Sequence, residues 1–98
     1  MKTYQVNIRP TAELEIRIRY EQIYAESPEN AKHWYKDLIS AIRTLEYLAL
    51  RCPIAEEDAE FKLGIRHLVV GRYRVIYVTT DDSVEVLHIR HSRHTRTL

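Results

Sequence analysis

The last third of the chain restricts the fold most strongly, because it joins apolar runs of strand character through short turns. Residues 61–78 and 84–93 are rich in β-branched and aromatic residues, and Gly71-Arg72 and Asp81-Asp82 interrupt them. A glycine at the first central place of a two-residue loop is typical of a tight hairpin. The pattern therefore predicts three consecutive antiparallel strands. They end in the basic sequence Arg90-His91-Ser92-Arg93-His94, which favours a surface that contacts phosphate or carboxylate.

The two turns also predict which residues lie opposite each other in the sheet. Side chains alternate between the two faces of a strand, so each pairing assigns every residue to a face. We expect His67, Arg74 and His91 on one face and Tyr73 on the other. Both faces mix polar and apolar residues, so the pattern does not identify the core side. The expected pairs include Val70–Tyr73, Val69–Arg74, His67–Ile76, Thr80–Ser83, Val75–His88 and Arg72–His91.

The N-terminal half predicts one strand followed by a helical hairpin. Residues 3–8 alternate as a short strand, and Pro10 interrupts it. Apolar residues then recur at helical spacing from Ala12, although the early isoleucines also suit a strand. Ser27-Pro28 starts a second helix, with the serine as cap and the proline in the first turn, and this helix is expected to reach about Leu50. The residues expected to point inward from the first helix are Ala12, Ile16, Tyr20, Ile23 and Tyr24.

Length and charge predict a single domain with two unlike halves. The 98 residues suffice for one modest core, so we expect one α+β domain over residues 1–98, of order β-α-α-β-β-β, with residues 91–98 as a basic tail. Residues 1–60 hold 8 Lys/Arg against 11 Asp/Glu, with an acidic loop at residues 55–60. Residues 61–98 hold 7 Lys/Arg against 3 Asp/Glu. The basic half favours an anionic partner.

Several classes of protein are disfavoured by the sequence. No apolar run approaches the roughly 20 residues that span a bilayer, and the start lacks a secretion signal, so we expect a cytoplasmic protein with no membrane association. The single cysteine, Cys52, fits a reducing compartment, and nothing beside it in sequence marks it as a nucleophile. His88, His91 and His94 recur every third residue, a spacing that does not converge imidazoles along a strand. We therefore expect neither a metal nor another cofactor.

The order of elements and two sequence segments resemble the RelE/ParE superfamily of toxins from bacterial type II toxin–antitoxin systems. The segments are residues 71–77, Gly-Arg-Tyr-Arg-Val-Ile-Tyr, and residues 86–93, Val-Leu-His-Ile-Arg-His-Ser-Arg. The resemblance extends from about Tyr4 to Arg93. An apolar strand that runs into Arg-His-small-Arg is closer to the ParE-like branch than to the RelE-like branch.

The resemblance implies a toxin neutralised by a cognate antitoxin in a hetero-oligomer. A ParE-like toxin would interfere with DNA gyrase without catalysis. The residues expected to contact that target are Arg72, Arg74, Arg90, His91 and Arg93. The aromatic residues expected to contact the antitoxin are Tyr20, Tyr24, Trp34 and Tyr35.

Two alternatives remain open at this point. A RelE-like toxin would cleave messenger RNA on the ribosome, with Arg74 and Arg93 at the phosphate and His91 or His67 moving protons. The lysines and the terminal tyrosine of such enzymes are absent, which counts against this alternative. The chain could also be a non-toxic binding module or an inactive toxin. In each case Arg74 could instead pair with an acidic residue on the helices, and His88 could be a packed histidine.

Overall fold

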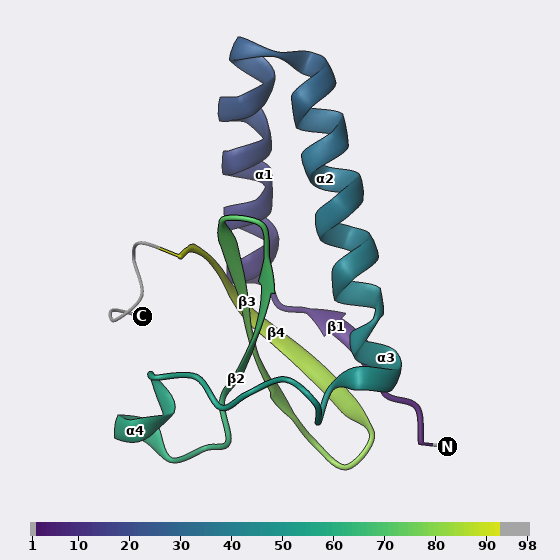
Figure 1. The fold of residues 1–98 in the computed structure, drawn as a ribbon, viewed down its shortest axis with the longest axis vertical. Helices are drawn as coiled ribbons and strands as arrows, with labels where there is room; N and C mark the ends of the chain where they lie inside the picture. The colour runs from purple at the N-terminus through teal and green to yellow at the C-terminus, as the bar shows by residue number, and fades with distance from the viewer. Residues whose placement is uncertain (1, 93–98) are drawn as a thin grey trace.

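The computed structural model describes residues 2–92 and contains the predicted order of elements (Figure 1). An N-terminal strand, two long helices and three antiparallel strands follow one another, so the α+β prediction is confirmed. Two one-turn helices were not predicted. The elements are β1 (Gln5–Ile8), α1 (Pro10–Glu26), α2 (Pro28–Arg43), α3 (Leu45–Leu48), α4 (Asp58–Phe61), β2 (Arg66–Val70), β3 (Tyr73–Thr79) and β4 (Ser83–His91).

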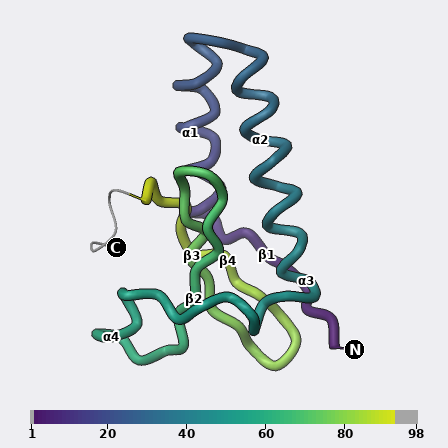
Figure 2. Tube along the Cα trace, viewed as in Figure 1, coloured from purple at the N-terminus to yellow at the C-terminus, as the bar shows by residue number. Residues whose placement is uncertain are grey.

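The four strands form one mixed sheet in the order β1-β4-β3-β2. β4 pairs in parallel with β1 and antiparallel with β3, and β2 pairs antiparallel with β3. The helices α1 and α2 run side by side and extend beyond one end of the sheet (Figures 1 and 2). The segment that contains α4 lies at the other end of the molecule's long axis. No helix among residues 2–92 is long and apolar enough to cross a membrane.

Local sequence signals set the helix boundaries. α1 begins at Pro10, two residues before the predicted start, since proline is well placed in a first turn. Ser27 separates the two helices, and its hydroxyl accepts a hydrogen bond from the Asn30 amide at 3.2 Å, as predicted for a cap. The prediction that the second helix reaches Leu50 is wrong. α2 ends at Arg43 and the Thr44 hydroxyl donates to the Ala41 carbonyl at 2.6 Å, a local bond that competes with continued helix.

The main core lies between the helices and one face of the sheet. Leu38, Ile42 and Leu45 pack there with Val75 and residues of β4. The fully buried Tyr77 donates from its hydroxyl to the Ala49 carbonyl at 2.5 Å and so connects the sheet to the chain after α3. Burial raises the pKa of this phenol, and nearby Cys52 raises it further, so the phenol remains a donor.

The prediction that the apolar residues of α1 point inward is correct near the sheet and wrong near the tip of the hairpin. Ala12 and Ile16 are buried, whereas 47% of Tyr24 is exposed. The helical spacing is the same along the whole of α1. The difference arises because the hairpin extends past the sheet, so that no strand covers its distal turns (Figure 1).

A β-bulge in β4 overturns part of the predicted register. The β2–β3 pairs are those predicted, and near the second turn Thr79 lies opposite Val84 as expected. The register shifts at Ile76/Tyr77, where Val86 and His88 pair with successive residues and Leu87 is the additional residue. Beyond this point the predicted pairs are wrong by one position. A one-residue shift moves every later side chain to the opposite face. Thus Val75 pairs with Ile89, Arg74 with Arg90, and Tyr73 with His91.

A second, smaller cluster lies on the opposite face of the sheet. Ala55 and Ile65 pack there against Ile76 and Val78. Ala55 begins the acidic loop and Ile65 precedes β2, so the segment between them covers part of the face that the helices leave open. Both faces of the sheet are partly apolar for this reason, which explains why alternation did not identify the core side.

Candidate functional site

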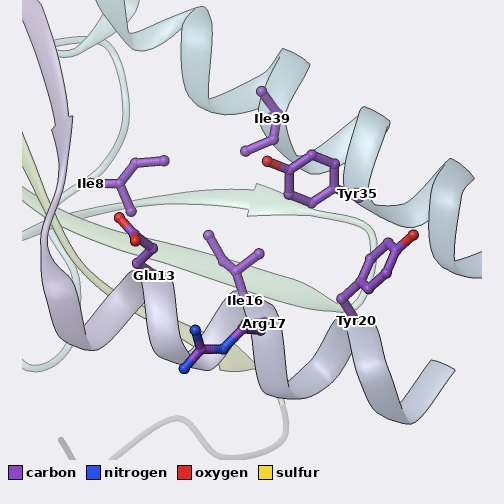
Figure 3. A pocket seen from close by; sticks show the side chains of 7 residues that line it. All are labelled: Ile8, Glu13, Ile16, Arg17, Tyr20, Tyr35 and Ile39. Carbon is purple, nitrogen blue, oxygen red and sulfur yellow. The ribbon is translucent and has the colours of Figure 1, made fainter. Parts of the chain in front are cut away.

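The helical hairpin and the end of β1 enclose an apolar groove (Figure 3). Its volume is about 470 Å³. Ile16 and Tyr20 of α1 point toward Ile39 and Tyr35 of α2 across it (Figure 3). The remaining lining residues are Ile8 of β1 and the charged Glu13 and Arg17 of α1. A groove between two helices with apolar walls and a charged rim suits an amphipathic peptide segment.

Two of the four predicted aromatic contact residues, Tyr20 and Tyr35, line this groove, and Tyr24 packs beside Tyr20. The Tyr20 ring is 5.9 Å from the Tyr24 ring and 5.9 Å from the Tyr35 ring, measured between centroids. Tyr24 and Tyr35 are each nearly half exposed. Trp34 lies away from the groove, because it is adjacent to Tyr35 on α2 and consecutive helical residues point about 100° apart. Its ring packs edge-on against Tyr73 of the sheet at 5.5 Å.

Arg74, a predicted target or phosphate contact, is buried in an ion pair. The guanidinium faces both oxygens of the Glu57 carboxylate, at 3.3 Å from Nη1 to Oε1 and 2.5 Å from Nη2 to Oε2. Only 5% of the Arg74 side chain and 2% of the Glu57 side chain is exposed. Arg74 thus pairs with an acidic residue, but the expectation that this residue lies on the helices is wrong, because Glu57 belongs to the acidic loop.

His67 joins the same cluster as a neutral base. Its Nδ1 lies 2.9 Å from Nη1 of Arg74. Arginine donates and never accepts, so Nδ1 accepts and the ring carries its proton on Nε2. Burial and then the positive charge of Arg74 lower the pKa of His67 below its ordinary value, against the opposing effect of Glu57 and Glu56. Burial alone would raise the pKa of Glu57, but the Arg74 hydrogen bond and charge outweigh it and the net pKa is lowered.

His91 lies on the other face of the sheet, away from His67 and Arg74. Its ring packs edge-on against Tyr73 at 5.3 Å, on the side of the helices. The guanidinium of Arg19 from α1 lies over the same tyrosine ring at 5.6 Å. The bulge in β4 causes this placement. The expected group of His67, Arg74 and His91 on one face is therefore wrong.

Arg90 and His88 are held by Glu15 of α1. The carboxylate accepts the Ile89 amide at 3.0 Å, and its oxygens lie 3.4 Å from His88 Nδ1 and 3.9 Å from Arg90 Nε. β1 pairs with β4 only as far as Val86, so β1 supplies no carbonyl acceptor farther along β4. The Glu15 carboxylate accepts the Ile89 amide there instead. Sequence reasoning missed both Glu15 and Glu57, since no local pattern identifies a partner so distant in the chain.

Of the remaining residues predicted to contact the target, Arg72 lies within the described part of the chain. Arg72 is exposed at the turn, and its carbonyl accepts the Ser92 amide at 2.7 Å. Arg93, His94 and most of the predicted tail lie outside the described residues. Within residues 2–92, no three His, Cys, Asp or Glu side chains are grouped to hold a metal ion.

Comparisons with known proteins agree with this fold. The profile of a family described as ParE toxin of type II toxin-antitoxin system, parDE, matches residues 6–96. A solved chain of the "Chromosomal ParDE TA system from P. aeruginosa" is similar to this chain with a TM-score of 0.75 and 15% sequence identity. The similarity covers 91% of this chain and 96% of that chain, and at this identity it bears on the fold alone. No curated protein matches the chain.

Proposed function

The chain belongs to the ParE toxin family of type II toxin–antitoxin systems, and from this we propose that it inhibits growth by binding DNA gyrase without catalysis. We further propose that a cognate antitoxin of the ParD type neutralises it by forming a hetero-oligomer. The proposal of gyrase as target rests on the likeness of the Arg-His-Ser-Arg ending to the ParE-like branch.

The separation of the candidate catalytic groups is the observation that supports a binding action. RNA cleavage by attack of a 2′-hydroxyl needs an acid, a base and cations around one phosphate. His67 pairs with Ile76 and His91 pairs with Tyr73. Ile76 and Tyr73 point to opposite faces of β3, so the two histidines also lie on opposite faces of the sheet. The Arg74 guanidinium is covered and faces a carboxylate. Among the described residues, these groups do not surround a common position.

The target surface is proposed at the end of the sheet where β4 stops. Arg72 is exposed there, and Arg90 precedes the basic tail, which begins at His91 and includes Arg93. Arg74 takes a different part in this proposal. Its side chain is 95% covered, so it supports the sheet and the acidic loop rather than contacting gyrase directly.

A ribosome-dependent messenger RNA endoribonuclease is the second candidate, for one reason. Arg74 and His67 are in contact at 2.9 Å, and a cation beside an imidazole is a pair that such chemistry uses. For catalysis, Glu57 would have to leave Arg74, and Arg93 would complete the phosphate contacts. An inactive toxin is the remaining alternative, and the experiment below addresses it as well.

The antitoxin is proposed to dock in the groove of the helical hairpin. Tyr20 and Tyr35 in the groove, with Tyr24 beside Tyr20, supply large aromatic surfaces with polar tips, which suit a protein interface. Trp34 was grouped with them from the sequence, but its ring faces Tyr73. We therefore expect Trp34 to contribute through the packing of α2 on the sheet.

The test uses induced expression in a bacterial host and purified gyrase. We expect a DNA-damage response with intact transcripts, and inhibition of supercoiling by the purified chain. The matched variant ends at Ser92. This truncation keeps every strand pair of the sheet, because β4 ends at His91. It should lose gyrase inhibition and still bind the antitoxin. Transcript cleavage without DNA damage would reverse the choice of target. Normal growth with folded protein, together with uninhibited gyrase, would indicate an inactive toxin.

A further inference from the structure

A second, smaller pocket lies between α1 and the end of β4. Ile18 and Arg19 line it from α1, and Tyr73 and Ile89 line it from the sheet. Its volume is about 270 Å³, whereas sites for small molecules span about 300–1,000 Å³. The pocket is therefore sized for a single inserted side chain rather than for a whole small molecule.

The pocket opens on the opposite side of α1 from the antitoxin groove. Each α1 residue that lines the pocket lies two positions after one that lines the groove. Two positions turn a helix by about 200°, so a segment docked in the groove leaves the pocket accessible. The groove residues of α1 are Glu13, Ile16, Arg17 and Tyr20, and the pocket residues are Glu15, Ile18, Arg19 and Gln22.

Arg19 gives the pocket a positive charge that no described carboxylate neutralises. Its guanidinium lies over the Tyr73 ring at 5.6 Å, and within residues 2–92 it has no ion pair. Glu15, the acidic residue of the pocket, is already engaged by β4, where it accepts the Ile89 amide and faces two basic side chains. A guanidinium over an aromatic ring retains N–H donors at its edge. Arg19 can therefore donate to an incoming anion.

The surroundings favour an acidic side chain of a protein over a nucleic acid. Ile18 and Leu14 are neighbours on α1, each nearly half exposed, so an apolar patch adjoins the pocket. Glu21 is exposed about one turn beyond Ile18, and Glu15 lies in the pocket wall. A nucleic acid carries a phosphate at every nucleotide, and these carboxylates would repel such a series of charges. One carboxylate beside an apolar side chain matches both the single cation and the patch.

We propose that this pocket binds an acidic side chain of the target protein, with Arg19 as the residue that contacts the carboxylate. An apolar neighbour of that side chain then packs on Leu14 and Ile18. The location supports the target as the source, because Arg90 and His91 line the pocket and also belong to the surface proposed for the target. The inference rests on the proposed function in this respect, and it adds α1 to the target surface.

The first experiment tests the pocket in the absence of any target. The probe is a capped leucine–glutamate–leucine tripeptide, and its glutamine analogue is the neutral control. Trp34 is the one tryptophan of the chain, and its ring packs against Tyr73 at 5.5 Å, so its indole resonance reports on the pocket. We expect saturable shifts of the Trp34 and Ile89 resonances with the acidic peptide, and at least about tenfold weaker binding of the neutral one. Equal responses to both peptides, or none, would overturn the proposal.

Variants of the chain complete this test. Arg19→Gln should abolish the preference for the acidic peptide, whereas Arg19→Lys keeps the charge and should retain most of it. Arg43→Gln is the matched control, because it makes the same substitution at an exposed position of α2 outside the pocket. An unaltered preference in Arg19→Gln would contradict the assignment. Displacement of the acidic peptide by a duplex DNA oligonucleotide would overturn it in favour of nucleic acid.

The second experiment identifies the source of the acidic side chain with purified gyrase and the antitoxin. Arg19→Gln should bind gyrase at least about tenfold more weakly than the wild type and Arg43→Gln do, with unchanged affinity for the antitoxin. Unchanged gyrase binding, or a loss of antitoxin affinity instead, would overturn the target as the occupant. A wild type that does not bind gyrase would refute the proposed function, and the peptide titration would still decide whether the pocket takes a carboxylate.

Discussion

Replacing Arg74 tests whether the buried ion pair maintains the fold. Arg74→Met keeps much of the apolar volume of the side chain and removes its charge. The Glu57 carboxylate, with 2% of its side chain exposed, would then lose the guanidinium that faces both of its oxygens. A buried charge without its partner is strongly unfavourable, since burial removes water that nothing replaces.

The expected loss is large relative to the stability of a small domain. Removing one partner of a buried pair costs about 3–5 kcal/mol, whereas domains of this kind are stable by only about 5–15 kcal/mol. Arg74→Met should therefore lose about 30–50% of a mid-range stability of about 10 kcal/mol. Arg74→Met/Glu57→Leu removes both charges, so it should recover most of the loss or exceed the wild type.

Urea denaturation of the wild type, Arg74→Met, Glu57→Leu and the double variant measures these differences. Arg72→Met is the matched control, because Arg72 is exposed two residues away and its replacement should change stability by less than about 0.5 kcal/mol. The reasoning fails if Arg74→Met unfolds at the wild-type urea concentration, or if the double variant is no more stable than the single one. A loss of toxicity in an Arg74 variant is informative about the target only after this measurement.

Three further predictions follow from the described contacts. Folding lowers the pKa values of His67 and Glu57, so the unfolded chain binds protons before the folded chain does as the solution is acidified. The free energy of unfolding should therefore decrease as pH is lowered, beginning near the ordinary pKa of 6.5 for His67 and near 4.5 for Glu57. Thermal midpoints between pH 4 and 8 test this, and a flat profile would contradict it. Tyr77→Phe leaves the Ala49 carbonyl without its hydroxyl donor and should cost about 1–3 kcal/mol in denaturant titrations; an unchanged midpoint would refute that role. Tyr35→Ala should weaken antitoxin binding at least about tenfold by calorimetry, whereas Tyr47→Ala, exposed outside the groove, should not; equal effects would remove the groove from the interface.

Local signals in the sequence determined the elements and their order. Ser27-Pro28 separates the helices as predicted, and the Gly71-Arg72 turn sets the β2–β3 register as predicted. Both depend on neighbouring residues, whose backbone preferences and hydrogen bonds are short-range. The family resemblance follows from the same elements, and for that reason it could be recognised before the fold was known.

Tertiary packing decided the composition of the candidate site. The bulge at Leu87 places Ile89 in the core and moves His91 away from His67, although strict alternation from the second turn predicts the reverse. A bulge depends on how a strand fits its neighbours and on no single residue type. The Arg74–Glu57 pair likewise joins residues 17 positions apart, and the Glu15 contact to β4 spans 74 positions. Sequence spacing predicts which face a residue occupies within one element. It does not predict which charge from another element will be buried against it, because that choice is made only when the elements pack.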